Sequence, residues 1–269
     1  FYAYVHNDPL IHSDLFGLMA QDLDKGWTYI PIYSPSDGSY VDPCTQRWWQ
    51  TQWPSPPGFT PEAPKYSPHY YVNGIGNDYF DHLQGARGLK SSLGKEANVI
   101  PYHSKSFGWT EDLHSVFQSR RETYTHDGIE KLRLTLQLEL ACMEIKQDPR
   151  KLFITCFSRG ATDVWHAVKD FSQEQKNRLV ITACGPTLFL PRDLGFSVIN
   201  LVSRSDWCSR FMANDFLYGK HPTADVIYLP PSGGHSLFQR EHYFLNHTYQ
   251  QGLRDHTQPL YEQFGAPGY

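Results

Sequence analysis

The stretch KLFITCFSRGA, residues 151–161, decides the fold, because a strand, a tight turn and the start of a helix follow one another in it. Its first residues form a short apolar run of the kind found in buried strands of parallel sheets. Ser158 stands at the turn between Cys156 and Gly160, both small enough for a tight backbone. An amphipathic helix follows, and its apolar positions are Val164, Trp165, Val168 and Phe171.

Similar apolar runs recur on both sides of this unit and alternate with helical patterns. The expected strands are residues 69–73, 98–102, 151–155, 178–183, 197–203 and 225–229. The clearest helical patterns cover residues 122–146 and about 159–171. Buried strands separated by helices predict an α/β domain, a three-layer sandwich with a mostly parallel central sheet.

A serine at a strand–turn–helix junction is placed for nucleophilic attack, because N–H groups at a helix N-terminus favour a developing oxyanion. The simpler interpretation is that Ser158 only caps the helix. A nucleophilic serine needs a histidine base, and the base needs an acid to orient it. In α/β-hydrolases these follow in the order Ser, acid, His, each just past a strand. Asp206 and His235 meet that order, which predicts a Ser158–His235–Asp206 triad.

Each partner has an alternative. Asp206 is also a plausible N-cap for the helical stretch after it. His235 follows Gly233-Gly234, which leaves the backbone free to bring its imidazole over Ser158, but it could equally be a turn residue. His242 is the reserve candidate for the base.

The oxyanion hole is expected in the glycine-containing loop after the first strand, Gly74-Ile75-Gly76, whose amides can face a ligand. The candidate donors are the amides of Gly74 or Ile75 together with that of Arg159. This loop is a weak candidate for phosphate binding, because no Gly-Lys-Ser/Thr follows it. The side chain of Arg159 could meet an anionic substrate group or form a salt bridge on the helix surface.

Composition excludes several other classes. A net charge of −4 argues against nucleic acid as a partner. No apolar run is long enough to span a membrane, and the first residues do not have the pattern of a signal peptide. The odd number of cysteines suggests buried apolar residues more than a disulfide framework, and no Cys/His spacing predicts a metal site. Neither a metal nor an organic cofactor is expected. Residues 19–68 are dense in Pro and Trp, which predicts an irregular strap, either plain packing or a lid.

Two parts of the chain resemble known families. Residues 1–18, FYAYVHNDPLIHSDLFGL, resemble the end of an Rhs/YD-repeat core, with Leu15 at the position of an expected proline. The segments VNGIGN (72–77), CFSRGA (156–161) and GGHSLFQREHY (233–243) resemble serine lipases and a chlamydial family of unknown function with a lipase-like fold. FSRGA is also similar to the corresponding turn of bacterial phospholipase effectors.

Together with the composition of the strap (19–68), these resemblances divide the chain into three segments, the other two being the end of the core motif (1–18) and an α/β-hydrolase-like domain (69–269). The resemblances further imply an acyl hydrolase, with lipid or phospholipid as the favoured substrate, a membrane surface as a candidate substrate, and secretion or delivery as an effector as a candidate route. As the C-terminal payload of a polymorphic toxin, the domain would have an Rhs shell and an immunity protein as partners. The alternatives are a non-lipid esterase, thioesterase or peptidase, and a hydrolase-like binding module without activity.

Overall fold

The computed structural model describes residues 66–75, 79–104, 114, 124–213, 224–231 and 242–266. Six strands within this part form one parallel sheet in the order β2-β1-β3-β4-β5-β6. The strands are β1 (His69–Val72), β2 (Val99–Tyr102), β3 (Leu152–Phe157), β4 (Leu179–Cys184), β5 (Ser197–Ser203) and β6 (Val226–Leu229). All the predicted strands are present, with ends that agree to within two residues.

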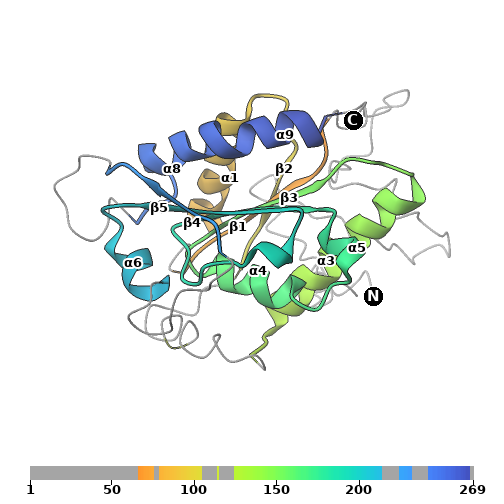
Figure 1. Ribbon diagram of the computed structural model, residues 1–269, viewed down its shortest axis with the longest axis horizontal. Helices are drawn as coiled ribbons and strands as arrows, with labels where there is room; N and C mark the ends of the chain where they lie inside the picture. The colour runs from red at the N-terminus through yellow and green to blue at the C-terminus, as the bar shows by residue number, and fades with distance from the viewer. Residues whose placement is uncertain are drawn as a thin grey trace, which may run out of the picture. The chain divides into compact units, whose positions relative to one another are not determined.

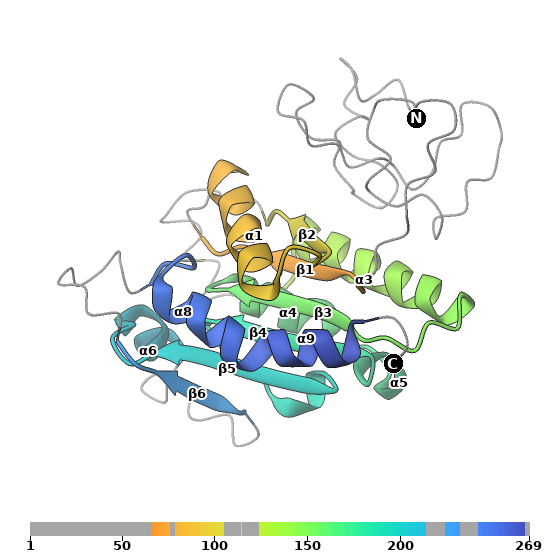
Figure 2. The ribbon, with the colours of Figure 1, turned by 90° about the horizontal axis from the view of Figure 1, so that it is seen from above.

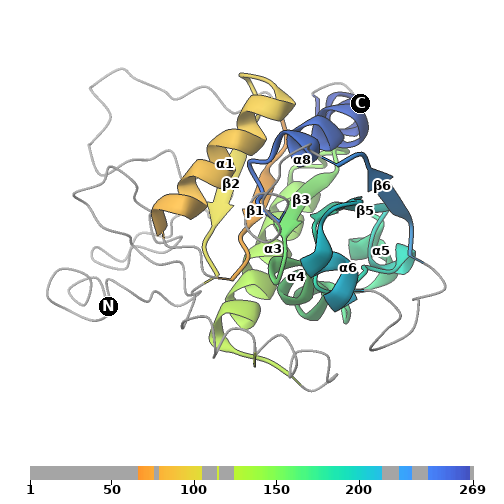
Figure 3. The same cartoon turned by 90° about the vertical axis from the view of Figure 1, so that its left-hand side faces the viewer.

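Helices cover both faces of the sheet (Figures 1 and 2). One layer contains α1 (Tyr79–Leu93), α8 (His247–Gly252), the π-helical turn η5 (Leu253–Thr257) and α9 (Gln258–Phe264). The other contains α4 (Gly160–Val168), α5 (Gln173–Lys176) and α6 (Trp207–Ala213), and a short 3₁₀ turn, η4 (Arg192–Leu194), precedes β5. Figure 3 shows α1 and α8 on one side of the sheet and α4, α5 and α6 on the other. The predicted α/β three-layer sandwich with a parallel central sheet is confirmed.

The central strands carry the core. Every residue of β3 and β4 is buried, as expected for strands covered on both faces. On the α8–α9 side the apolar core includes Phe153, Val180, Tyr249, Leu253 and Tyr261. The backbone N–H of Ser67, ahead of β1, donates to the carbonyl of Gly265, after α9, at 2.8 Å. This hydrogen bond therefore joins the first and the last described segments next to the N-terminal end of β1.

The chain divides into two compact units, and the boundary falls inside α3 (Asp127–Ile145). Residues 131–148 are the described part of one unit, and the remaining described residues belong to the other. The helix predicted over residues 122–146 is present as α3. Its predicted apolar positions are all buried, namely Ile129, Leu132, Leu136, Leu140 and Met143.

Some predictions receive no structural description. The segment 1–18 and the strap 19–68, apart from its last three residues, lie outside the described part, as does His235. Among the cysteines, Cys156 and Cys184 are free and buried as expected, whereas Cys142 is disulfide-bonded, contrary to expectation. No helix in the described ranges is long and apolar enough to cross a membrane.

Candidate active site

The turn at Ser158 is strained. β3 ends at Phe157, α4 begins at Gly160, and Ser158 between them has φ = 54°. An L-residue in this left-handed region costs about 1–3 kcal/mol and persists only where its surroundings impose it. Here the carbonyl of Ser158 accepts hydrogen bonds from the backbone N–H and from the hydroxyl of Thr187, both at 3.2 Å. The turn is thus locked from the loop after β4, and strain of this kind is typical of functional sites.

Two glycines permit the close packing around this turn. A Cβ at Gly160 would lie 2.7 Å from the carbonyl oxygens of Val72 and Asn73, so only glycine lets α4 start against the end of β1. A Cβ at Gly74 would lie 2.7 Å from the Cβ of Ser158. The loop after β1 is therefore in direct contact with the serine, as expected of an oxyanion loop.

Cys156 occupies the position where such turns usually have glycine. Its side chain is fully buried within the sheet, and the thiol donates to the carbonyl of Thr182 on β4 at 3.7 Å. Burial raises the pKa of this thiol, so it stays neutral. The sheet accommodates the substitution without disturbing the turn.

Ser158 contacts a histidine that in turn contacts a buried carboxylate. The Nε2 atom of His242 is 2.9 Å from Ser158 Oγ, and its Nδ1 atom is 2.9 and 3.0 Å from the two oxygens of Asp206. A carboxylate can only accept, so Nδ1–H donates to Asp206, and the neutral ring accepts the Ser158 proton at Nε2. The ring of Phe157 packs against that of His242, with centroids 4.9 Å apart.

The Asp206 carboxylate has further donors. The backbone N–H and the hydroxyl of Ser209 donate to it at 2.9 and 3.1 Å, and the hydroxyl of Tyr249 on α8 makes a short hydrogen bond to Oδ2. Gly185, with φ = 52°, passes so close that a Cβ there would lie 2.9 Å from the same oxygen. The possible capping role of Asp206 is realised as well, since its bond to the Ser209 amide lies in the first turn of α6.

Electrostatics support this arrangement. Burial alone would raise the pKa of Asp206, but the hydrogen bonds from His242 and Tyr249 outweigh it and lower the pKa. Burial alone would lower the pKa of His242, but the hydrogen bond to Asp206 and its charge outweigh it and raise the pKa. Asp206 is thus held ionised, and it makes His242 a stronger base.

The histidine between Ser158 and Asp206 is His242, the reserve candidate in the sequence prediction, which preferred His235 as the base. His235 lies outside the described residues, while both partners of the predicted base are engaged by His242. His242 lies just ahead of α8, the helix whose Tyr249 also contacts Asp206.

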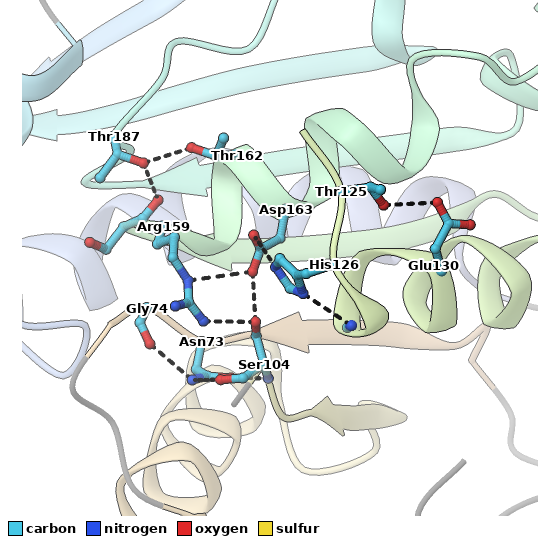
Figure 4. A network of polar contacts seen from close by, with 12 residues as sticks. Asn73, Gly74, Ser104, Thr125, His126, Glu130, Arg159, Thr162, Asp163 and Thr187 are labelled. Carbon is cyan, nitrogen blue, oxygen red and sulfur yellow. Dashed lines mark hydrogen bonds and ion pairs between the residues drawn. The ribbon is translucent and has the colours of Figure 1, made fainter. Parts of the chain in front are cut away.

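The candidate oxyanion donors belong to the loop after β1 and to the turn at Ser158. Gly74 contacts it directly, Ile75 follows Gly74, and Arg159 follows Ser158 at the start of α4. The Arg159 side chain, predicted either to meet an anionic substrate group or to form a salt bridge on the helix surface, forms a salt bridge with Asp163 in the interior instead of at the surface. It is buried, with Nη2 donating to Ser104 Oγ at 2.9 Å and Nε 3.6 Å from Asp163 Oδ2 (Figure 4).

The described residues contain no group of three or more His, Cys, Asp or Glu side chains that could hold a metal ion. The polar groups around Ser158 are instead those of a nucleophile, a base and an acid in hydrogen-bond contact.

Comparisons with known proteins give structural similarity only. No protein family and no curated protein sequence match this chain. A Trichoderma reesei cutinase solved with a phosphonate inhibitor is similar to it with a TM-score of 0.37 and 10% identity, over 73% of this chain and 75% of the cutinase. Aspergillus fumigatus lipase B gives 0.38 and 12%, over 66% of this chain and about half of the lipase, 48%. RedJ, solved with a polyethylene glycol molecule in its active site, gives 0.39 and 13%, over 78% and 98%.

Proposed function

We propose that this protein is a serine hydrolase that cleaves carboxylic esters through Ser158, His242 and Asp206. The observation that carries the proposal is the unbroken chain of contacts from Asp206 through His242 to Ser158, with Ser158 on a strained turn against Gly74. A serine in hydrogen-bond contact with a histidine, whose ring is oriented by a buried carboxylate, has the geometry required of an activated nucleophile.

In the proposed reaction, Ser158 Oγ attacks the ester carbonyl while His242 Nε2 takes its proton. Asp206 holds the ring and stabilises the imidazolium that forms. Backbone amides of the Gly74–Ile75 loop and of Arg159 stabilise the tetrahedral oxyanion. Collapse expels the alcohol, which receives the proton from His242. Water, activated by His242, then releases the acid and restores Ser158.

A lipid or phospholipid acyl ester is the favoured substrate. Trp207 and Tyr243 directly follow Asp206 and His242, and their side chains are 54% and 42% exposed. Aromatic side chains that keep a polar group at an exposed position suit the boundary between water and an apolar phase. The resemblance of VNGIGN and CFSRGA to lipases and phospholipase effectors points the same way.

The test is hydrolysis of a p-nitrophenyl ester series from acetate to palmitate and of phosphatidylglycerol vesicles, together with fluorophosphonate labelling. Wild type should hydrolyse the long esters best, and Ser158→Ala and His242→Asn should lose about 10⁴-fold or more in kcat/KM with folding intact. His235→Asn is the matched control and should keep most of the activity. A wild type that neither labels nor hydrolyses any ester is the result expected of an inactive binding module, and would end the proposal.

We also propose that the domain is the toxic payload of an Rhs-type protein, on the resemblance of residues 1–18 alone. Bacteria that express the chain in the periplasm should stop growing and release lysophospholipid or fatty acid. The Ser158→Ala variant, at the same expression level, should be harmless. Growth arrest that persists in that variant would separate toxicity from ester cleavage.

A further inference from the structure

Asn73 is a fully buried residue between β1 and the oxyanion loop, and the reaction above gives it no role. Its side-chain amide makes three hydrogen bonds. Oδ1 accepts from the backbone N–H of Ser104 at 2.7 Å, and Nδ2 donates to the carbonyls of Ser104 and Gly74, both at 3.0 Å. Because Oδ1 faces a donor and Nδ2 faces acceptors, the orientation of the amide is determined.

The bond to Gly74 has a geometric consequence. In a planar trans peptide the carbonyl of one residue and the N–H of the next point in opposite directions, and the described part contains no cis peptide. When Asn73 holds the carbonyl of Gly74, it therefore also sets the direction of the Ile75 N–H. Since Gly74 lies against Ser158, that direction decides whether the N–H faces the oxygen of the reacting carbonyl.

Asn73 is itself held through Ser104 (Figure 4). The hydroxyl of Ser104 donates to Asp163 Oδ2 at 2.6 Å and accepts from Arg159 Nη2 at 2.9 Å. All four side chains are buried, so their polar contacts replace those with water and fix their geometry. Because Arg159 directly follows Ser158, the contacts run from the nucleophile turn to the oxyanion loop without a break.

We propose that Asn73, Ser104, Arg159 and Asp163 form a positioning network that aims the Ile75 N–H at the oxyanion. The inference rests on the proposed ester hydrolysis and narrows its oxyanion donors to the amides of Ile75 and Arg159. Arg159 then contributes to both donors of the oxyanion hole. Its backbone amide is one donor, and its guanidinium, through Ser104 and Asn73, holds the loop that carries the other donor, the Ile75 amide. Interactions realised only in the transition state raise kcat without changing KM.

The first test compares Ser104→Val with Ser104→Thr, which have the same shape and differ only in the hydroxyl. Both are assayed on a soluble ester, with rates expressed per Ser158 titrated by a fluorophosphonate. Affinity for a trifluoromethyl ketone, whose adduct with serine bears an oxyanion, is measured alongside. We expect kcat and inhibitor affinity to fall together by roughly tenfold in the Val variant, with KM unchanged and the Thr variant close to wild type.

The second test is Asn73→Leu, which keeps the size of the side chain and removes all three hydrogen bonds. We expect about a 10²-fold loss in kcat and in inhibitor affinity, the effect of losing one oxyanion donor. Ser104→Ala replaces the matched pair if neither variant folds. Unchanged kcat and inhibitor affinity in Asn73→Leu, or equal losses in Ser104→Val and Ser104→Thr, would overturn the network. An inactive wild type would instead overturn the proposed function.

Discussion

Asp206 and Asp163 invite comparison, because each is a buried aspartate in contact with a histidine. Both carboxylates are almost inaccessible to solvent, 0% and 2% exposed. For Asp163, as for Asp206, burial would raise the pKa, but the hydrogen bond from its histidine and a second partner, here the charge of Arg159, lower it. By burial, charge and pairing, the two sites look alike.

The difference lies in the second nitrogen of each histidine. His242 places Nε2 at 2.9 Å from Ser158 Oγ, whereas Nδ1 of His126 accepts the backbone N–H of Gly128 at 3.0 Å. Nε2 of His242 can therefore accept a proton from a hydroxyl, whereas Nδ1 of His126 already accepts a hydrogen bond from the backbone. A buried Asp–His pair is therefore no sign of catalysis until the far side of the imidazole is examined.

The largest expected effect separates the two histidines. His242→Gln should lower kcat/KM by about 10⁴-fold or more, because no other group near Ser158 in the described part accepts its proton. His126→Gln keeps a donor for Asp163 and should stay within a few-fold of wild type. Steady-state kinetics on one soluble ester measure both, and similar losses in the two variants would erase the distinction.

Replacing the two aspartates should have opposite consequences: Asp206→Asn should mainly lower kcat, and Asp163→Asn should mainly lower the free energy of unfolding. Asp206→Asn should lower kcat by about 10⁴-fold, because the ring of His242 loses the acceptor that orients it. Asp163→Asn leaves the buried Arg159 uncompensated, and should cost about 3–5 kcal/mol in the free energy of unfolding with a far smaller loss of kcat per folded molecule. Urea denaturation followed by circular dichroism gives the stability of each variant. Equal destabilisation of the two would contradict the comparison.

The pH profile sharpens the account of Asp206. His242 must be neutral to accept the proton of Ser158, so kcat/KM should be low at acid pH and rise through the pKa of His242, which lies above its ordinary 6.5. Tyr249→Phe removes a donor from Asp206, whose charge then acts more fully on His242. The rising limb should move to higher pH by a few tenths of a unit, and a shift to lower pH would contradict this role of Tyr249.

The last prediction concerns His69, a buried histidine whose Nε2 is 2.8 Å from Thr155 Oγ1 and which forms no ion pair within the described ranges. Burial lowers its pKa to about 3. Between pH 6.5 and 3 the unfolded chain takes up a proton that the folded protein refuses, so stability falls as the pH falls. His69→Gln should remove about 1.4 kcal/mol per pH unit from that slope. Urea midpoints at pH 7, 6 and 5 measure the slope, and an identical slope in the variant would refute the assignment.

Much of the sheet could be predicted because each strand is a short apolar run bounded by polar residues. The helix α1 was not predicted, because Gly85 and Gly88 interrupt its apolar pattern. A Cβ at these positions would lie 2.3 Å from Tyr71 Oη and 2.2 Å from Leu245 Cδ2, so the glycines serve close packing that only the tertiary structure reveals. The helices from α8 to α9 were also missed, although their buried residues recur at helical spacing: Tyr249, Leu253, Thr257, Tyr261 and Phe264.

In the site, Ser158 and Asp206 could be placed because Ser158 directly follows β3 and Asp206 lies three residues after the end of β5, and parallel strands end at one edge of a sheet. The base could not be chosen, since His235 and His242 both follow β6 in the sequence and residue types alone do not predict which of them reaches Ser158. Nor does the sequence pattern bring Asn73, Ser104 and Asp163 together. Each comes from a different element, and only the register of β1 with β2 and β3 joins them.

The separation of the contacting residues along the chain has a consequence for folding. Ser158 and His242 are 84 residues apart, Asp206 and Tyr249 are 43 apart, and the bond between Tyr261 and Ser67 spans 194 residues. Contacts between distant segments pay the largest loop-closure entropy and form late. The central strands β3 and β4, which pair over a short separation, can therefore be in place while Ser158 still lacks its contact with His242, so the proposed ester cleavage would require the later closure of the chain.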